Sequence, residues 1–200
     1  ITATDANVTS NSLTMTANTG SVEASRLTAT VADQASVEAG NSVTLDSSKL
    51  GLGALTASAK SSDLSLTSAE IEVSGAAKLT AQDSITATDA NVTSNSLTMT
   101  AETGSVEASD FMATVAGQAL VEAGDSVTLD NAELTAGALT ATAKKGNLSV
   151  KDAEVTTKTG GVTLTAEAAD INASNTKLTA EGEVKLTAQN SITATDASVE

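Results

Sequence analysis

The sequence predicts an all-β protein: a right-handed parallel β-helix (β-solenoid) with three short strands per coil and about 21 residues per coil. Three observations predict it. The segment Ile1 to Glu70 recurs at Ile85 to Glu154, with 51 of 70 positions identical. A shorter repeat of about 21 residues lies inside the long one, and no segment shows the 3.6-residue period of a helix. The 200 residues also include one Phe and no Trp or Tyr, which fits a narrow core of small aliphatic side chains.

The first strand of each coil begins at a recurring apolar position, which we call the anchor. Anchor and anchor+2 are apolar and the residue between them is polar, as in Val43-Thr44-Leu45, which is the alternation of a half-buried strand. Successive anchors differ by 21 in residue number, except for one step of 23. The anchors are Ile1, Val22, Val43, Leu64, Ile85, Val106, Val127, Leu148, Ile171 and Ile192.

Two further strands are expected in each coil. The second is centred on anchor+7, where Val8, Leu50 and Ile71 are examples. The third contains an apolar pair such as Leu13/Met15 or Val162/Leu164, whose offset from the anchor varies by a residue or two. The corner before the third strand must therefore vary in length. Gly, Asn, Asp and Ser lie between the stretches and suit tight corners.

Each strand is expected to pair with its equivalent in the next coil, about 4.8 Å away, so that nine anchor steps give a rod about 43 Å tall. The preference of parallel crossovers favours a right-handed coil. We expect residues 1–200 to form one continuous segment of about nine and a half coils, cut from a longer repeat array, because the same motif opens the chain at Ile1 and recurs at Ile192.

Size compensation supports this register. Anchor+5 is small in most coils, and the two large exceptions are Leu27 and Phe111. Those two coils carry Ala29 and Ala113 at anchor+7, where the other coils have larger residues. Close packing requires such an exchange of volume. The sequence therefore predicts that Phe111 fills the core and does not bind a ligand.

A polar column is expected at anchor+4, at the corner between the first and second strands. Stacked Asp, Asn and Ser side chains there can hydrogen-bond the corner backbone or one another. The column comprises Asp5, Arg26, Ser47, Ser68, Asp89, Asp110, Asn131, Asp152, Asn175 and Asp196.

Composition excludes several functions. The chain has no His and no Cys, so it has no histidine base, thiol, disulfide or His/Cys metal site. Its net charge is −15 and aromatic stacking platforms are missing, which argues against nucleic acid as a partner. No uncharged apolar run approaches the ~18 residues of a membrane span.

Three runs resemble a known family: Gly124-Asp125-Ser126-Val127-Thr128-Leu129, Gly160-Gly161-Val162-Thr163-Leu164-Thr165 and Gly182-Glu183-Val184-Lys185-Leu186-Thr187-Ala188. They are similar to the haemagglutinin-type repeats of two-partner secretion exoproteins, which include filamentous-haemagglutinin-like adhesins and the stalks of contact-dependent inhibition proteins. The resemblance covers the whole chain. It implies right-handed β-helices with repeats of about 20 residues. It also implies a secreted or cell-surface filament of a Gram-negative bacterium, and it transfers no catalytic residue.

Three chemical functions are alternatives to a plain shaft. Polysaccharide-acting solenoid enzymes need paired carboxylates or Ca²⁺ with a basic residue, but here the carboxylates are scattered and the one Arg, Arg26, lies at a corner. Calcium binding is the second alternative. Asp89 and Asp110 fall in one column on successive coils, where two close carboxylates repel each other unless a cation or a proton intervenes. We expect a solvated acidic corner with only weak, unspecific Ca²⁺ binding.

Ice binding is the third alternative. Outward Thr-x-Thr motifs recur on the third strand, but charged side chains interrupt them. The motifs are Thr14-x-Thr16, Thr98-x-Thr100 and Thr140-x-Thr142, and the interruptions include Glu38, Lys78, Glu122 and Lys185. Gly160-Gly161 and Gly51-x-Gly53 are expected at corners, and Lys144-Lys145 in a solvated turn.

The sequence thus predicts a structural segment, a rigid shaft or filament of a large secreted or surface-exposed bacterial adhesin-like protein. It predicts no enzyme, no catalytic, cofactor or metal residue, no nucleic-acid partner and no membrane span. The expected partners are neighbouring coils, end-to-end copies of the chain, and host or neighbouring-cell surfaces contacted by other parts of the parent protein. A glycan- or surface-binding solenoid module is the rival interpretation.

Overall fold

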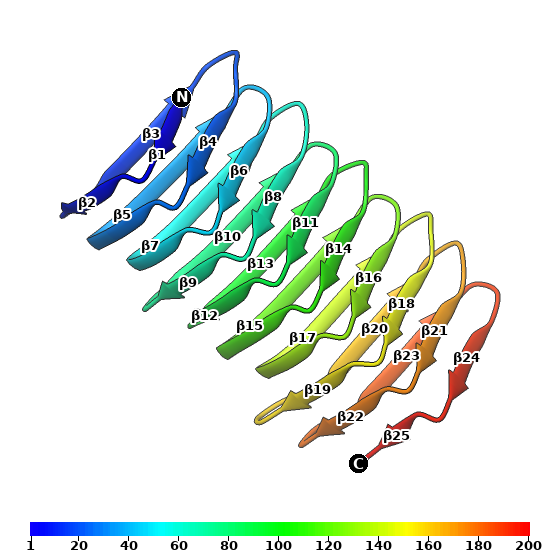
Figure 1. The fold of residues 1–200 in the computed structure, drawn as a ribbon. Coiled ribbons are helices and arrows are strands. Elements are labelled where there is room, and N and C mark those ends of the chain that lie inside the picture. The colour runs from blue at the N-terminus through cyan, green and yellow to red at the C-terminus, as the bar shows by residue number, and fades with distance from the viewer.

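The computed structural model describes all 200 residues as strands and turns, without a helix. Figure 1 shows the chain winding as a stack of similar coils from the N-terminus at one end to the C-terminus at the other. All strand pairs are parallel and join consecutive coils, for example Val43 with Leu64 and Leu64 with Ile85. The prediction of a parallel β-solenoid with about 21 residues per coil is therefore confirmed.

The first strands of the coils form one 10-stranded sheet in strict sequence order. Each begins at or next to an anchor, and its apolar residues point into the core while the polar residues between them point out. These strands are β1 (Thr2–Thr4), β4 (Val22–Ser25), β6 (Val43–Asp46), β8 (Leu64–Thr67), β11 (Ile85–Thr88), β14 (Val106–Ser109), β16 (Val127–Asp130), β18 (Leu148–Lys151), β21 (Ile171–Ser174) and β24 (Ile192–Thr195).

The second and third strands share a 15-stranded sheet. Separate second strands are β2 (Asn7–Ser10), β9 (Glu70–Val73), β12 (Asn91–Ser94), β19 (Glu154–Thr157), β22 (Lys177–Ala180) and β25 (Ser198–Val199). Separate third strands are β3 (Leu13–Ala17), β10 (Ala76–Ala81), β13 (Ser96–Ala101), β20 (Val162–Ala166) and β23 (Val184–Ala188).

In four coils the second and third strands run on as one long strand, which the sequence did not predict. They are β5 (Thr28–Ala39), β7 (Lys49–Ala59), β15 (Met112–Ala123) and β17 (Glu133–Ala143). The register between β5 and β7 shifts by one residue between Val31 and Gln34, and β15 and β17 shift likewise between Val115 and Gln118. A bulge takes up the extra residue, so the expected variation in corner length is present without a break in pairing.

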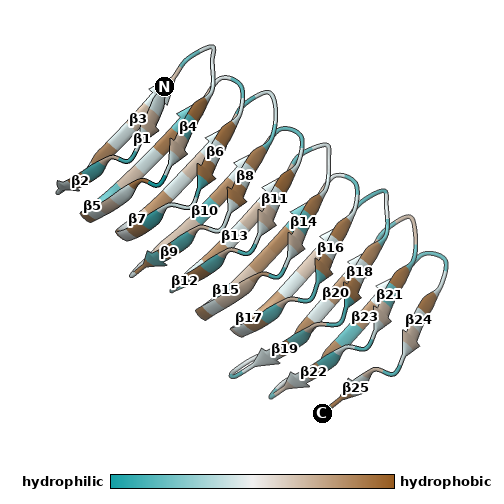
Figure 2. Ribbon diagram, in the orientation of Figure 1, coloured by the Kyte–Doolittle hydropathy of each residue, from teal (hydrophilic) through white to brown (hydrophobic).

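The core is one continuous column. Buried residues from Met15 to Leu178 belong to a single apolar cluster, built almost entirely from Ala, Val, Leu and Ile. Figure 2 shows hydrophobic residues (brown) recurring along the strands of successive coils. Because each coil closes the core of its neighbour, the stack is stabilised by the same small contacts repeated along its axis.

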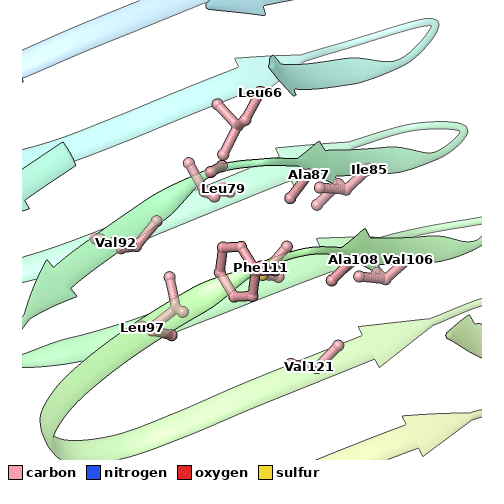
Figure 3. Close-up of a cluster of buried hydrophobic side chains, with 14 of the residues drawn as sticks. Leu66, Leu79, Ile85, Ala87, Val92, Leu97, Val106, Ala108, Phe111 and Val121 are labelled. Carbon is pink, nitrogen blue, oxygen red and sulfur yellow. The ribbon is translucent and has the colours of Figure 1, made fainter. Parts of the chain in front are cut away.

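Phe111 lies inside this column, as predicted, with 2 % of its surface exposed. Figure 3 shows its ring among the buried side chains of the coils around it, which include Val92, Leu97 and Val121. Ala113, on the same coil, is 1 % exposed. The large ring and the small alanine therefore occupy the core together, as the size compensation in the sequence required.

Candidate functional surfaces

The corner between the first and second strands has one backbone conformation in every coil. The ten residues of the anchor+4 column all have φ between 49° and 53° and are the only residues with positive φ. This is the left-handed region, which Asp and Asn tolerate better than most L-residues. The residues of the polar column predicted from the sequence therefore form the left-handed turn at this corner. Arg26, Ser47 and Ser68 adopt this backbone conformation at a higher cost in free energy than Asp or Asn.

Side chains of this column bond to each other along the axis, as expected. The Arg26 guanidinium donates to Asp5, with Nη2 2.7 Å from Oδ2, and the Asn175 amide donates to Asp152 Oδ1 at 2.9 Å. Asn131 donates to Asp110 in the same way. The hydrogen bond from Arg26 lowers the pKa of Asp5. The pKa of Asp152 is lowered by the hydrogen bond from Asn175 and, to a smaller extent, by the hydrogen bond from Lys151. These exposed pairs align neighbouring corners.

Asp89 and Asp110 follow one another in this column, as the calcium hypothesis required, and Asp110 also accepts the bond from Asn131. Nowhere in the structure do three or more acidic side chains gather closely enough to hold a metal ion. Two carboxylates supply at most four of the six to eight oxygen ligands that Ca²⁺ takes, and water would have to supply the rest. The arrangement fits a solvated acidic corner.

A second side-chain ladder, which we did not predict from the sequence, lies immediately before the anchors. The backbone N–H of Ser84 donates to Asp63 Oδ1 at 2.9 Å, and that of Ser105 donates to Ser84 Oγ at 3.1 Å. The N–H of Ser191 donates to Asp170 Oδ1 at 3.0 Å. The signal was present in the sequence, because every residue before an anchor from Val22 onward is Ser, Asp or Asn. The ladder satisfies corner N–H groups that strand pairing leaves free.

A shallow depression of about 380 Å³, lined by four acidic residues, lies over the coils of β15, β17 and β19. Glu133 and Glu154 are register partners there, and Asp110 and Asp152 also line the depression. Glu154 is 54 % exposed and is 3.4 Å from Lys177 Nζ. Phe111 lines the depression but is buried, so it offers no ring for a sugar to stack on. Adjacent glutamates alone, open to water, do not make the acid and base of a glycosidase.

The outward side chains of the nine third strands, which we call the third-strand face, form two rows that stay in register from β3 to β23. The first row is Thr14, Ser36, Thr56, Lys78, Thr98, Leu120, Thr140, Thr163 and Lys185. The second row is Thr16, Glu38, Ser58, Thr80, Thr100, Glu122, Thr142, Thr165 and Thr187. Threonines therefore stack as the ice-binding alternative supposed, and charged residues interrupt them as expected.

Several glycines allow the backbones of neighbouring coils to approach closely. No glycine has positive φ, but a Cβ on Gly161 would collide with the carbonyl oxygen of Glu183, and a Cβ on Gly53 with that of Asp33. Gly160-Gly161 lies in the turn before β20, as predicted. Gly51 and Gly53 both lie within β7, so the prediction that Gly51-x-Gly53 forms a corner is wrong. Lys144-Lys145 lies in the exposed turn after β17, as expected.

No protein-family model, no curated protein and no solved structure matches this chain. The structure has no helix long and apolar enough to cross a membrane. The resemblance to haemagglutinin-type repeats stays a prediction that rests on the three sequence runs.

Proposed function

We propose that this chain is a structural repeat segment, a rigid shaft or filament section of a large secreted or surface-exposed bacterial adhesin-like protein. The observation that carries the proposal is the unbroken stack: ten first strands follow one another in a single sheet from β1 to β24. A ladder that continues in every coil resists bending and keeps its two ends at a fixed separation. Corner bonds such as Asp5 N–H to Ser25 O, at 3.0 Å, extend the ladder beyond the strands.

The exterior supports the same role. Its charged side chains lie along the shaft, most of them exposed, and all but one of its ion pairs join neighbouring coils, as Lys49 and Glu70 do at 2.8 Å. Such pairs contribute little stability individually, but a net charge of −15 keeps the shaft soluble. The proposal assigns no catalytic, cofactor or metal residue to the segment. It places the receptor-binding or toxic activity elsewhere in the parent protein.

The proposed location is the cell surface or the extracellular space, and the proposed source is a Gram-negative bacterium. The resemblance of the three glycine-containing runs, which begin at Gly124, Gly160 and Gly182, to haemagglutinin-type repeats supports both. Coils of the parent protein, or copies of the chain stacked end to end, are the proposed axial partners, because a terminal coil offers the same backbone groups that pair inside the stack. A full-length sequence carrying a secretion domain and further units of the same period would support this assignment.

A deletion tests the spacer role directly. Removing residues 43–126 joins Ser42 to Val127 and takes out four coils, and the junction keeps the native order Ser-Val found at Ser126-Val127. A spacer should remain folded and become shorter by about 19 Å, at about 4.8 Å per coil. A matched deletion of residues 43–116, which breaks the repeat register, should unfold. Unfolding of both proteins would contradict the proposal.

The rival function is a glycan- or surface-binding module. The rows of the third-strand face and the depression near Glu133 are the surfaces that would serve it. A glycan array and a cell-binding assay on the 200-residue chain separate the two functions. The shaft predicts no saturable binding, and saturable binding removed by substitutions on one of these surfaces would favour the module. Ice binding and a polysaccharide-acting enzyme stay weaker alternatives.

A further inference from the structure

The third-strand face differs in charge from the rest of the shaft. Its outward side chains include two lysines, Lys78 and Lys185, and two glutamates, Glu38 and Glu122, so its charge sums to zero. The adjacent surface, made of the anchor+4 corner and the outward residues of the second strands, carries ten acidic and three basic side chains. In a chain with net charge −15, the third-strand face is where two copies repel each other least.

The face is also regular in register and built mostly from short side chains. Its nine strands pair without a register shift inside the face, from Leu13 with Ala35 to Val184 with Val162. Thirteen of its eighteen outward side chains are Thr or Ser, and Leu120 is the one apolar residue among them. Rows of small identical side chains on stacked in-register strands can approach a second sheet closely.

Three of the four charges on the face, Glu38, Lys78 and Glu122, alternate in sign at a fixed interval, and Lys185 lies three coils beyond Glu122. Glu38 lies on the second coil, Lys78 on the fourth and Glu122 on the sixth, so successive charges are two coils, or about 10 Å, apart along the axis. Lys78 belongs to the first row, and both glutamates belong to the second row. When two parallel shafts face each other, the first row of one lies opposite the second row of the other.

An offset of two coils then matches opposite charges. Lys78 of the first copy lies opposite Glu38 of the second copy. Lys78 of the second copy lies opposite Glu122 of the first copy. Lys60 already pairs with Glu38 at 3.1 Å in the same chain, so Glu38 would share two lysines. Charge complementarity of this kind fixes the register of an interface more than it raises affinity.

The area available fits a weak pair. Seven coils overlap at this offset, and a face about 16 Å wide and about 29 Å long gives roughly 500 Å² per copy. The total of about 1,000 Å² lies at the low end for specific interfaces, where association is weak or transient.

We propose that two copies of this chain associate side by side through the third-strand face, with their axes parallel and offset by two coils. The interface buries rows of threonine and is set in register by Lys78 against Glu38 and Glu122. This inference does not depend on the role of the parent protein, since it follows from the charge and shape of the face. It assigns lateral pairing to a surface that axial stacking leaves open.

Sedimentation equilibrium over a wide range of concentration tests the proposal. Lys78→Glu should raise the dissociation constant of the pair at least ten-fold, because it sets like charges opposite both glutamates. Lys177→Glu is the matched control: it changes the net charge by the same amount, on the second-strand surface, and should change the dissociation constant less than two-fold. Circular dichroism melts should establish that both variants remain folded.

A mixture provides the decisive result. The Lys78→Glu protein mixed with a Glu38→Lys/Glu122→Lys double variant should form mixed pairs at least as tightly as the native chain. If the double variant melts early, Glu122→Lys alone serves in its place. Its native Lys78 faces Glu38 of the Lys78→Glu copy, and its new lysine at position 122 faces the new glutamate at position 78, so both contacts stay matched. A native chain that stays monomeric at every concentration would overturn the proposal, as would equal effects of Lys78→Glu and Lys177→Glu. Association that ignores all of these variants would indicate end-to-end stacking instead.

Discussion

Gly124→Ala is the sharpest perturbation of coil-to-coil packing that the structure offers. Gly124 follows β15, where the chain turns toward β16. A Cβ built there would collide with the carbonyl oxygen of Glu102 and would lie 2.7 Å from Thr103 Cα and 2.8 Å from Glu102 C, all backbone atoms of the preceding coil. No rotation of a side chain relieves such contacts, so one coil must move away from the other by about 1 Å to regain van der Waals separation.

That movement strains two backbone hydrogen bonds between the same coils, Gly124 N–H to Ala101 O at 2.8 Å and Asp125 N–H to Gly104 O at 2.9 Å. Overpacking of this kind costs about 1–3 kcal/mol of unfolding free energy. For a chain of this length each kcal/mol shifts Tm by about 2–4 °C, so we expect Gly124→Ala to lower Tm by about 2–12 °C. Thermal melts followed by circular dichroism provide the measurement.

Gly20→Ala is the matched control, since Gly20 lies in an equivalent corner of the first coil and a Cβ there meets nothing within 4 Å. Neither glycine has positive φ, so neither substitution carries a conformational penalty of that kind. Gly20→Ala should be neutral or stabilise the chain by up to about 1 kcal/mol by restricting its unfolded state. Equal melting of the two variants would refute the stated reason for glycine at these corners.

Four further outcomes follow from the same geometry. Val127→Asp should lower the unfolding free energy by several kcal/mol, because Val127 is 0 % exposed and the carboxylate would be buried without a partner, whereas outward Thr128→Asp should leave the melt nearly unchanged. Ser68→Gly should stabilise the chain by up to about 1 kcal/mol in a urea titration, because Ser68 has φ 49°. The pKa of Asp5 is lowered by Arg26, so their pairing stabilises the fold above the ordinary value of 3.8 and is lost as pH falls below it; the Tm difference between the native chain and Arg26→Ser should shrink over that range. Low-millimolar Ca²⁺ should not raise Tm by many degrees, in a melt compared with the same concentration of Mg²⁺.

The parts of the fold that depend on spacing could be predicted from the sequence. Identical residues recur only where they face the same environment in each coil, so the anchors, the outward threonines and the anchor+4 column were found by counting along the chain. The burial of Phe111 followed from volume alone, since Ala113 leaves space that a ring can fill.

The parts that depend on local backbone geometry could not be predicted in this way. In β5 the second and third strands run on as one strand because a bulge at Ala32 and Asp33 accommodates one extra residue. The sequence does not distinguish such a bulge from a corner, because both use similar residues. The glycines were assigned to turns for conformational freedom, yet Gly124 is required by the carbonyl of Glu102 one coil away. Such a contact depends on the distance between coils and not on the residues beside Gly124.

The candidate surfaces, too, could be predicted from the sequence only in part. The sequence identified the Thr-x-Thr motifs and the pair Asp89 and Asp110, because both are columns in a fixed register. It did not identify the acidic depression, whose walls come from the corner and the second strand of different coils. It identified Glu38, Lys78 and Glu122 as interruptions of the threonine motifs, but it did not indicate that they could match opposite charges on a second copy.

Distance measurements between spin labels test the central claim, a shaft that rises by a constant step per coil. The chain has no Cys, so labels can be attached to cysteines introduced at the outward, register-equivalent positions Thr44, Thr128 and Thr193. Thr44 and Thr128 are four coils apart and Thr44 and Thr193 are seven, which predicts separations of about 19 Å and about 34 Å. Pulsed electron–electron double resonance should show a narrow distance distribution for each pair, with mean distances that differ by about 15 Å. Equal separations, or broad distributions for either pair, would contradict a rigid solenoid.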